Sequence, residues 1–145
     1  MEEHFQTIDA DIIGLSEVDA IAGTKGECTF QLIKMMRALE YSVIYFPKSN
    51  NMSGSAIFYK DARFNCMESM YCPYSKDSSQ FFMYARFNLK ERPSFELIFG
   101  ETHLKAKKEF IKDRMEQTKI LKGWLERQEY QNMPIFIGGD FNEEP

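Results

Sequence analysis

Residues 134–145, PIFIGGDFNEEP, hold the most specific pattern in this sequence. An apolar run of this kind is typical of a central strand that is buried on both faces. The two glycines that follow allow the backbone to turn sharply and to approach a ligand closely. Asp140 and Asn142 then lie two residues apart, and an aspartate that orients water beside an amide donor suits phosphoester hydrolysis. The alternative is an ordinary turn, because turns favour Gly, Asp and Asn.

A second stretch, IIGLSEVD at residues 12–19, also runs from an apolar strand into polar residues. Open sheets usually hold their sites just beyond such strand ends. A carboxylate there, such as Glu17 or Asp19, is an oxygen ligand suited to a hard cation like Mg²⁺. A solvated loop carboxylate produces the same pattern, so this stretch alone leaves both interpretations open.

The third stretch, GETHLK at residues 100–105, contains His103 and Lys105. Side chains two residues apart on a strand lie on the same face, so we expect both to face one phosphate as hydrogen-bond donors. The alternative is a histidine with a purely structural role at the end of a strand.

Apolar periodicity predicts several strands in succession. We expect them at residues 11–15, 42–46, 55–60, 81–89, 95–104 and 134–140, with a polar loop at 47–54 and a turn at 90–94. The stretch 81–89 alternates apolar and polar side chains, which is typical of a half-buried strand. In the stretch 95–104 the shared face holds Phe95, Leu97, Phe99, Glu101 and His103.

Two helices accompany these strands. One is expected over residues 29–41 with Thr29 as its N-cap, and the other over residues 108–130. The periodicity of the second helix predicts a buried face made of Ile111, Met115, Leu121, Trp124 and Leu125. Consecutive strands with two helices suggest sheets that pack on each other with the helices outside.

Composition limits the classes of function. The length of 145 residues suits one domain, and a net charge of -4 gives no global attraction to nucleic acid, so any polyanion site must be local. The three cysteines, Cys28, Cys66 and Cys72, lack metal-knuckle spacing and predict a reducing, cytoplasmic setting. The acidic N-terminus and the absence of an apolar run near 20 residues predict neither a signal peptide nor a membrane span.

The order of the motifs resembles a known superfamily. LSEVD, GSAIFYK, THLK and GDFNEEP follow one another as in the endonuclease/exonuclease/phosphatase superfamily. TFQLIKMMRALEYSVIYFPK, THLKAK and the helix with Arg114 and Gln117 are most similar to the branch of nocturnin-like and carbon catabolite repression deadenylases. The resemblance covers nearly the whole chain but not the whole family domain, so we expect residues 1–145 to be a single partial domain.

The resemblance implies a fold and a site. The fold is an α/β (α+β) four-layer α/β/β/α sandwich, here incomplete at both ends. Glu17 matches the metal-ligand glutamate, for one or two Mg²⁺ or Mn²⁺ ions, and His103, Asp140 and Asn142 match the catalytic residues. The candidate phosphate-binding or substrate-binding residues are Lys48, Lys105 and Lys107, although a single lysine is often only solvated.

The resemblance also implies an activity, with two substrates left open. These are 3′-to-5′ exonuclease action on poly(A) RNA and removal of a phosphate from NADP(H), without DNA specificity or membrane binding. The family's metal-binding asparagine, a later aspartate and a terminal Asp-His pair have no counterpart here, and Gly14 and Ser16 replace a Cys-type residue and a glutamine. We therefore expect the chain to be inactive by itself. A non-catalytic binding or scaffold protein is the alternative.

Overall fold

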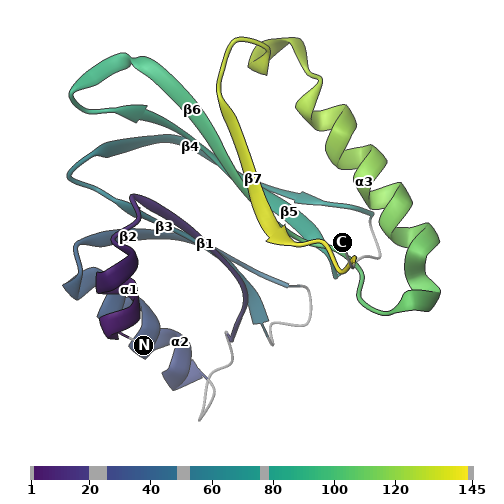
Figure 1. Cartoon of the computed structure of the whole chain (residues 1–145), viewed down its shortest axis with the longest axis horizontal. Helices are drawn as coiled ribbons and strands as arrows, with labels where there is room; N and C mark the ends of the chain where they lie inside the picture. The colour runs from purple at the N-terminus through teal and green to yellow at the C-terminus, as the bar shows by residue number, and fades with distance from the viewer. Residues whose placement is uncertain (1, 20–25, 49–52, 76–78, 144–145) are drawn as a thin grey trace.

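The structure is a computed structural model that describes residues 2–19, 26–48, 53–75 and 79–143 (Figure 1). The side chains of residues 2, 26–30 and 128 lie outside the description. In chain order the elements are α1 (Glu2–Ile8), β1 (Ile12–Asp19), α2 (Gly26–Ala38), β2 (Tyr41–Pro47), β3 (Ser53–Lys60), β4 (Phe64–Pro73), β5 (Phe81–Leu89), β6 (Arg92–His103), η1 (Lys108–Phe110), α3 (Ile111–Leu125), η2 (Gln128–Tyr130) and β7 (Ile135–Asp140).

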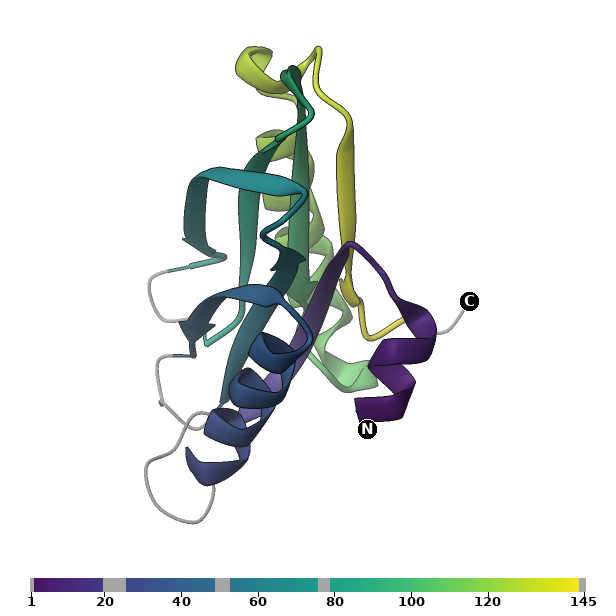
Figure 2. The same cartoon turned by 90° about the vertical axis from the view of Figure 1, so that its left-hand side faces the viewer.

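Two sheets form the centre of the molecule. The first has the strand order β1-β3-β2 and is antiparallel, and the second has the order β4-β5-β6-β7. In the second sheet only β6 and β7 are parallel. α1 and α2 lie against the outer side of the first sheet and α3 against the outer side of the second (Figures 1 and 2). The layers therefore confirm the predicted α/β/β/α sandwich.

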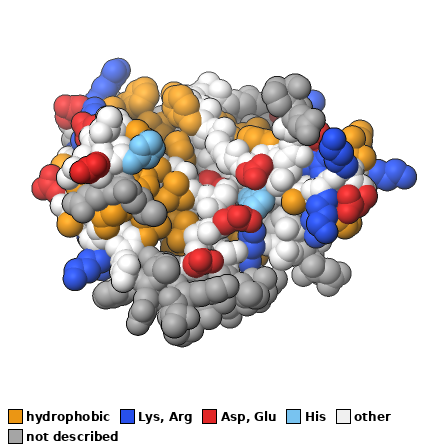
Figure 3. All heavy atoms as spheres, turned by 60° about the horizontal axis from the view of Figure 1, so that its bottom comes forward, with side chains coloured by type: hydrophobic (Ala, Val, Ile, Leu, Met, Phe, Trp, Pro, Cys, Tyr) orange, Lys and Arg blue, Asp and Glu red, His pale blue; other side chains and the backbone are white. Residues whose placement is uncertain are grey.

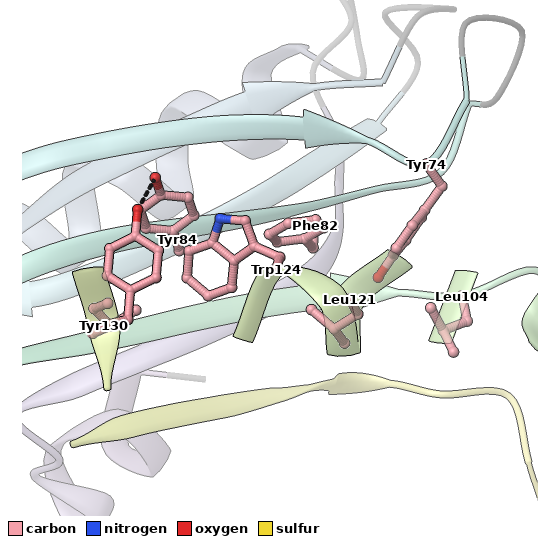
Figure 4. Packing of buried hydrophobic residues seen from close by; sticks show 8 residues of the cluster. Tyr74, Phe82, Tyr84, Leu104, Leu121, Trp124 and Tyr130 are labelled. Atoms are coloured by element: carbon pink, nitrogen blue, oxygen red, sulfur yellow. Dashed lines mark hydrogen bonds between the residues drawn. The ribbon is translucent and has the colours of Figure 1, made fainter. Parts of the chain in front are cut away.

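The buried apolar side chains form one cluster between each pair of layers. Beneath α1 and α2 lie Phe5, Val18, Met36, Tyr41, Ala56 and Phe58. Between the two sheets lie Ile57, Phe64, Phe81, Met83, Ala85, Phe87 and Leu97. Beneath α3 lie Tyr74, Phe82, Tyr84, Ile98, Leu104, Leu121, Trp124 and Tyr130 (Figure 4). Each sheet thus contributes one face to the inner cluster and one to a helix-covered cluster.

The strand β5 is buried on both faces, so the prediction of a half-buried strand was wrong. Its outward face carries Phe82 and Tyr84, and α3 covers them: the ring centroids of Tyr84 and Trp124 are 4.3 Å apart. The Tyr84 and Tyr130 hydroxyls are 3.0 Å apart, which satisfies both beneath the helix (Figure 4). The polar-looking face of β5 is therefore a second core face.

The buried face of α3 also differs from the prediction. Ile111 and Met115 are exposed, and the buried residues are Arg114, Gln117, Leu121 and Trp124. Arg114 donates from Nη1 to the carbonyls of Lys105 (3.0 Å) and Lys107 (2.7 Å). Gln117 Oε1 accepts from the Lys105 backbone N–H at 2.9 Å. Burial of these two polar side chains is explained by this pairing with the loop backbone.

The strand β7 is an edge strand among the described residues, not the central strand that its apolar run predicted. It pairs only with β6 in this part of the chain, and Phe136 is 56% exposed. An apolar run is typical of strands covered on both sides, and here that cover is missing from the described residues.

Several element boundaries were also displaced. α2 begins at Gly26, so Thr29 lies within the helix and is not its N-cap. β1 continues to Asp19, and the expected 90–94 turn contracts because Leu89 already pairs with Arg92. β4 was not predicted, since its more buried positions at Phe64, Cys66 and Glu68 include a charged residue and a bulge lies between Cys66 and Glu68. Within the described residues no helix is long and apolar enough to cross a membrane.

Replacing Trp124 by alanine should destabilise the protein strongly, because its ring is 3% exposed in the cluster beneath α3. We expect a loss of about 3–5 kcal/mol in the free energy of unfolding, measured by urea denaturation followed by circular dichroism. Met115→Ala, on the face that the sequence predicted to be buried, should change the value by about 0.5 kcal/mol or less. A larger effect at Met115 than at Trp124 would contradict the observed helix face.

Candidate active site

A β-bulge in β1 decides where Glu17 points. Leu15 pairs with Ala56 and Val18 with Gly54, so Ser16 and Glu17 together stand opposite Ser55 alone. Strict alternation would send Glu17 to the α2 side, where Leu15 packs. The extra residue puts Val18 there instead, and Glu17, with φ of 56°, turns away from that side. Bulges commonly re-aim a side chain in this way.

His103, the last residue of β6, is the point on which several chain segments converge. Its Nδ1 lies 3.4 Å from Lys48 Nζ and 3.9 Å from Glu17 Oε1, and its Nε2 lies 4.0 Å from Asp140 Oδ2. His103 and Lys48 are buried, whereas the Glu17 and Asp140 carboxylates are exposed. Figure 3 shows acidic side chains and a histidine together near the middle of the face that it draws. Glu17, His103 and Asp140, which the family resemblance assigns to one site, therefore lie close together in the structure, and Asn142 follows in the turn beside Asp140.

The charge state of His103 follows from this setting. Burial lowers the pKa of the imidazole below its ordinary value, and the Lys48 charge acts in the same direction. The carboxylates of Glu17 and Asp140 oppose this shift. His103 is therefore neutral near pH 7, with one ring nitrogen available as a donor and the other as an acceptor.

Parallel pairing of β6 with β7 brings Asp140 beside His103. The two residues are register partners at the same end of adjacent strands. Gly139, with φ of 136°, makes this pairing close, because a Cβ at that position would meet the Thr102 carbonyl oxygen at 1.8 Å. Here the glycine is required both by its backbone conformation and by the approach of β6.

Asn142 completes the turn after β7. Its backbone N–H donates to Asp140 Oδ1 at 2.8 Å, and its side-chain amide donates to the Leu104 carbonyl at 2.9 Å. GDFN thus forms a turn, and this turn holds the Asp140 carboxylate beside His103 with its Oδ2 on the histidine side. Asn142 itself is anchored to the end of β6.

Lys105 and Lys107 lie apart from this group. β6 ends at His103, so the alternation that was expected to bring Lys105 to the same side does not continue. The Lys105 ammonium lies 4.9 Å from the Phe110 ring centroid. Lys107 shares a surface pocket of about 320 Å³ with Asn142 and Arg114. Of the three candidate lysines, Lys48 is the one found against His103.

Sequence reasoning gave no role to Glu101, although it recognised that Glu101 and His103 share a face of β6. The residue is 1% exposed, and its Oε1 accepts a hydrogen bond from Ser16 Oγ. Burial raises the pKa of Glu101, while the Ser16 and Ser55 hydroxyls and the Lys48 charge oppose that shift. A glutamate in an otherwise apolar alternation was the signal that could have identified it.

The described residues supply only part of the ligands that a metal ion would need. Within residues 2–19, 26–48, 53–75 and 79–143, no group of three or more His, Cys, Asp and Glu side chains is arranged to hold one. Glu17 offers an exposed carboxylate, but Mg²⁺ prefers near-octahedral oxygen coordination. The described residues therefore do not form a ligand set for this ion.

Comparison with known structures places the fold. The chain is similar to the human nocturnin catalytic domain (24% identity, TM-score 0.81), covering 99% of this chain and 55% of that one. It is also similar to ANGEL2, a 2′,3′-cyclic phosphatase (18% identity, TM-score 0.83), and that match covers 99% of this chain and 43% of ANGEL2. For an endonuclease/exonuclease/phosphatase family protein from Bacteroides thetaiotaomicron the identity is 22% and the TM-score 0.75. The match covers 97% of this chain and 52% of that one.

These similarities confirm the endonuclease/exonuclease/phosphatase fold, with nocturnin among the neighbours. No protein-family profile and no curated protein matches the sequence. The chain spans about half the length of the structures that it resembles.

Replacing Lys48 by methionine should raise the pKa of His103, because the ammonium that disfavours the imidazolium is removed. Glu17→Gln should lower the pKa further, since a favourable negative charge is lost. Both shifts can be measured by NMR titration of ¹³C-labelled histidine, with His4 as the internal reference. A fall in the His103 pKa on Lys48→Met would contradict the electrostatic assignment.

Proposed function

We propose that this chain carries part of the active site of a phosphoesterase that acts on nucleotide or RNA phosphate groups. The observation that supports this most directly is neutral His103 flanked by Lys48, Glu17 and Asp140 where the two sheets meet. Donors, a cation and carboxylates at one strand end suit in-line attack on a phosphoryl group, because charge develops there on several oxygens.

His103 supplies a hydrogen-bond donor in this proposal. The Lys48 ammonium can donate hydrogen bonds but cannot accept them. Nδ1 of the neutral ring, which faces it, is therefore the acceptor, and Nε2 carries the proton. The 4.0 Å between Nε2 and Asp140 Oδ2 exceeds a hydrogen bond. A phosphoryl oxygen that approaches this gap receives the Nε2 proton as a hydrogen bond.

Asp140 orients and deprotonates the attacking water in the same scheme. Its Oδ1 is occupied by the Asn142 backbone N–H at 2.8 Å, which fixes the carboxylate and leaves Oδ2 for the water. Glu17 is proposed as one oxygen ligand of Mg²⁺ or Mn²⁺. The remaining ligands would come from outside the described residues, as in the family pattern that the sequence resembles.

We propose a class of substrate and, within that class, two specific substrates. ANGEL2, described as a 2′,3′-cyclic phosphatase in complex with adenosine-2′,3′-vanadate, supports a nucleotide phosphoester, and the nocturnin catalytic domain holds a sulfate anion. Poly(A) RNA and NADP(H) are the two specific substrates that the sequence resemblance favours, and Lys107 in the pocket beside Asn142 is the proposed contact for a further phosphate.

Cys66 and Cys72 are free thiols, in keeping with the expected cytoplasmic setting.

In a longer protein that contains this stretch within a complete domain, Asp140→Ala should abolish turnover without unfolding. We expect a loss of about 100-fold to 10,000-fold in kcat, because water positioning is removed while the exposed carboxylate at the end of β7 leaves no core cavity behind. Poly(A) shortening and phosphate release from NADP(H) are the measurements.

Asp61→Ala is the matched control for this experiment, since Asp61 makes only a surface ion pair with Lys90 at 3.4 Å. Activity of the Asp140→Ala variant within a few-fold of the parent protein would remove the proposed role.

The 145-residue chain alone should hydrolyse neither substrate at a useful rate, bind Mg²⁺ weakly and tend to associate. Among the described residues, the outer edge of β7 has no neighbouring strand and lies beside exposed Phe136, which makes it a template for strand addition. Light scattering after gel filtration measures association, and Phe136→Lys should reduce it. A monomeric chain whose metal-dependent activity disappears on Glu17→Ala would contradict this expectation.

A further inference from the structure

Glu101 is a buried carboxyl near the end of β6, where this strand faces Gly14 and Ser16 of β1. Ser16 Oγ donates to its Oε1 and the Ser55 hydroxyl lies near the same carboxyl, while no donor among the described residues reaches the buried Oε2 with hydrogen-bond geometry. Burying a carboxyl is unfavourable unless its oxygens are well paired. The mechanism above gives Glu101 no contact with substrate, so its place inside the sandwich requires another explanation.

The backbone of β1 leaves a space that fits Glu101. A Cβ at Gly14 would meet both Glu101 Cγ and Phe99 Cε1 at 3.2 Å. The glycine therefore allows β1 to lie close against the inner face of β6. Ser16, two residues further along the same face, then reaches the Glu101 carboxyl. Gly14 and Ser16 together dock the end of β1 onto the strand that carries His103.

Ser16, which contacts Glu101, is the first of the two residues in the β1 bulge. Glu17 follows Ser16 directly and adopts φ of 56°, a conformation that residues other than glycine and asparagine rarely adopt. Such a conformation persists only where the surroundings hold it. If Ser16 is released from β6, the bulge is free to relax toward regular pairing, which turns Glu17 toward the α2 side.

We propose that Ser16 and Glu101 are positioning residues, whose buried hydrogen bond holds the β1 bulge so that Glu17 points at His103. This inference rests on the proposed function, which explains why the position of Glu17 matters. The geometry that it invokes comes only from contacts within this chain. Glu101 and His103 lie two residues apart on one face of β6, so the bond fixes Glu17 relative to the strand that carries its partner.

The test is a double-mutant cycle read from the imidazole signals of His103. The chain has two histidines, so selective ¹³C,¹⁵N-histidine labelling gives two ring systems, with His4 as the internal reference. Spectra are recorded at pH 8 without metal, where His103 is neutral. Selective labelling keeps both rings observable even in a small oligomer.

We expect Glu17→Gln to move the His103 ring signals and leave those of His4 in place. Ser16→Ala should move the His103 signals in the same direction, and in the Ser16→Ala background Glu17→Gln should add much less. Ser16→Thr, which keeps the hydroxyl, and Glu101→Gln, which keeps an acceptor, should retain the full effect of Glu17→Gln. Glu101→Leu should lose it.

Ser42→Ala is the matched control, because it removes the same hydroxyl from β2, where Ser42 lies beside Tyr59 and not beside Glu101. Circular dichroism verifies that each variant is folded, and Glu101→Leu replaces Ser16→Ala if the latter is not. The proposal is overturned if Glu17→Gln moves the His103 signals equally with and without the Ser16 hydroxyl, or not at all. Because neither metal nor substrate is used, an inactive domain does not affect this outcome.

Discussion

The contact between the inner faces of β1 and β6 is the constraint on which the rest of this site depends. β6 is covered by the first sheet on one side and by α3 on the other, so its inner-face residues Leu97, Phe99, Glu101 and His103 are buried or half-buried. At the end of that face apolar residues give way to Glu101 and His103, which are buried as well. The close approach of Gly14, and of Gly139 on the neighbouring strand, leaves the polar side chains little freedom to move.

Some of this arrangement could be predicted from the sequence and some could not. The alternation from Phe95 to His103 is a local property of one strand, and it gave the correct inner face. The bulge at Ser16 and Glu17 depends on register with β3, which no local pattern reveals. Apolar periodicity left Arg114 and Gln117 out of the predicted buried face of α3, yet they are buried, since the loop at residues 105–107 offers them backbone partners.

Lys48 links two buried groups that would otherwise be independent. Its positive charge favours the carboxylate of Glu101 and disfavours the imidazolium of His103, so one ammonium biases both groups. Lys48 is held there because its backbone N–H donates to the Ser53 carbonyl at 2.8 Å. This setting differs from that of a surface lysine, which is solvated and contributes little to its neighbours. A phosphate bound at His103 would meet a cation that is already positioned.

The same burial bears on the choice between an enzyme and a scaffold. Ser16 stands where the superfamily that the sequence resembles commonly has glutamine, and the shorter side chain is met by Glu101 from the opposite sheet. A scaffold gains stability from apolar residues at such positions, because buried charged groups are often no more stabilising than hydrophobic ones of similar size. Glu101, Lys48 and His103 are nevertheless all buried around one strand end. Retaining such groups is understandable where the geometry of Glu17 and His103 matters more than the stability of the sandwich, which favours a catalytic origin for this site.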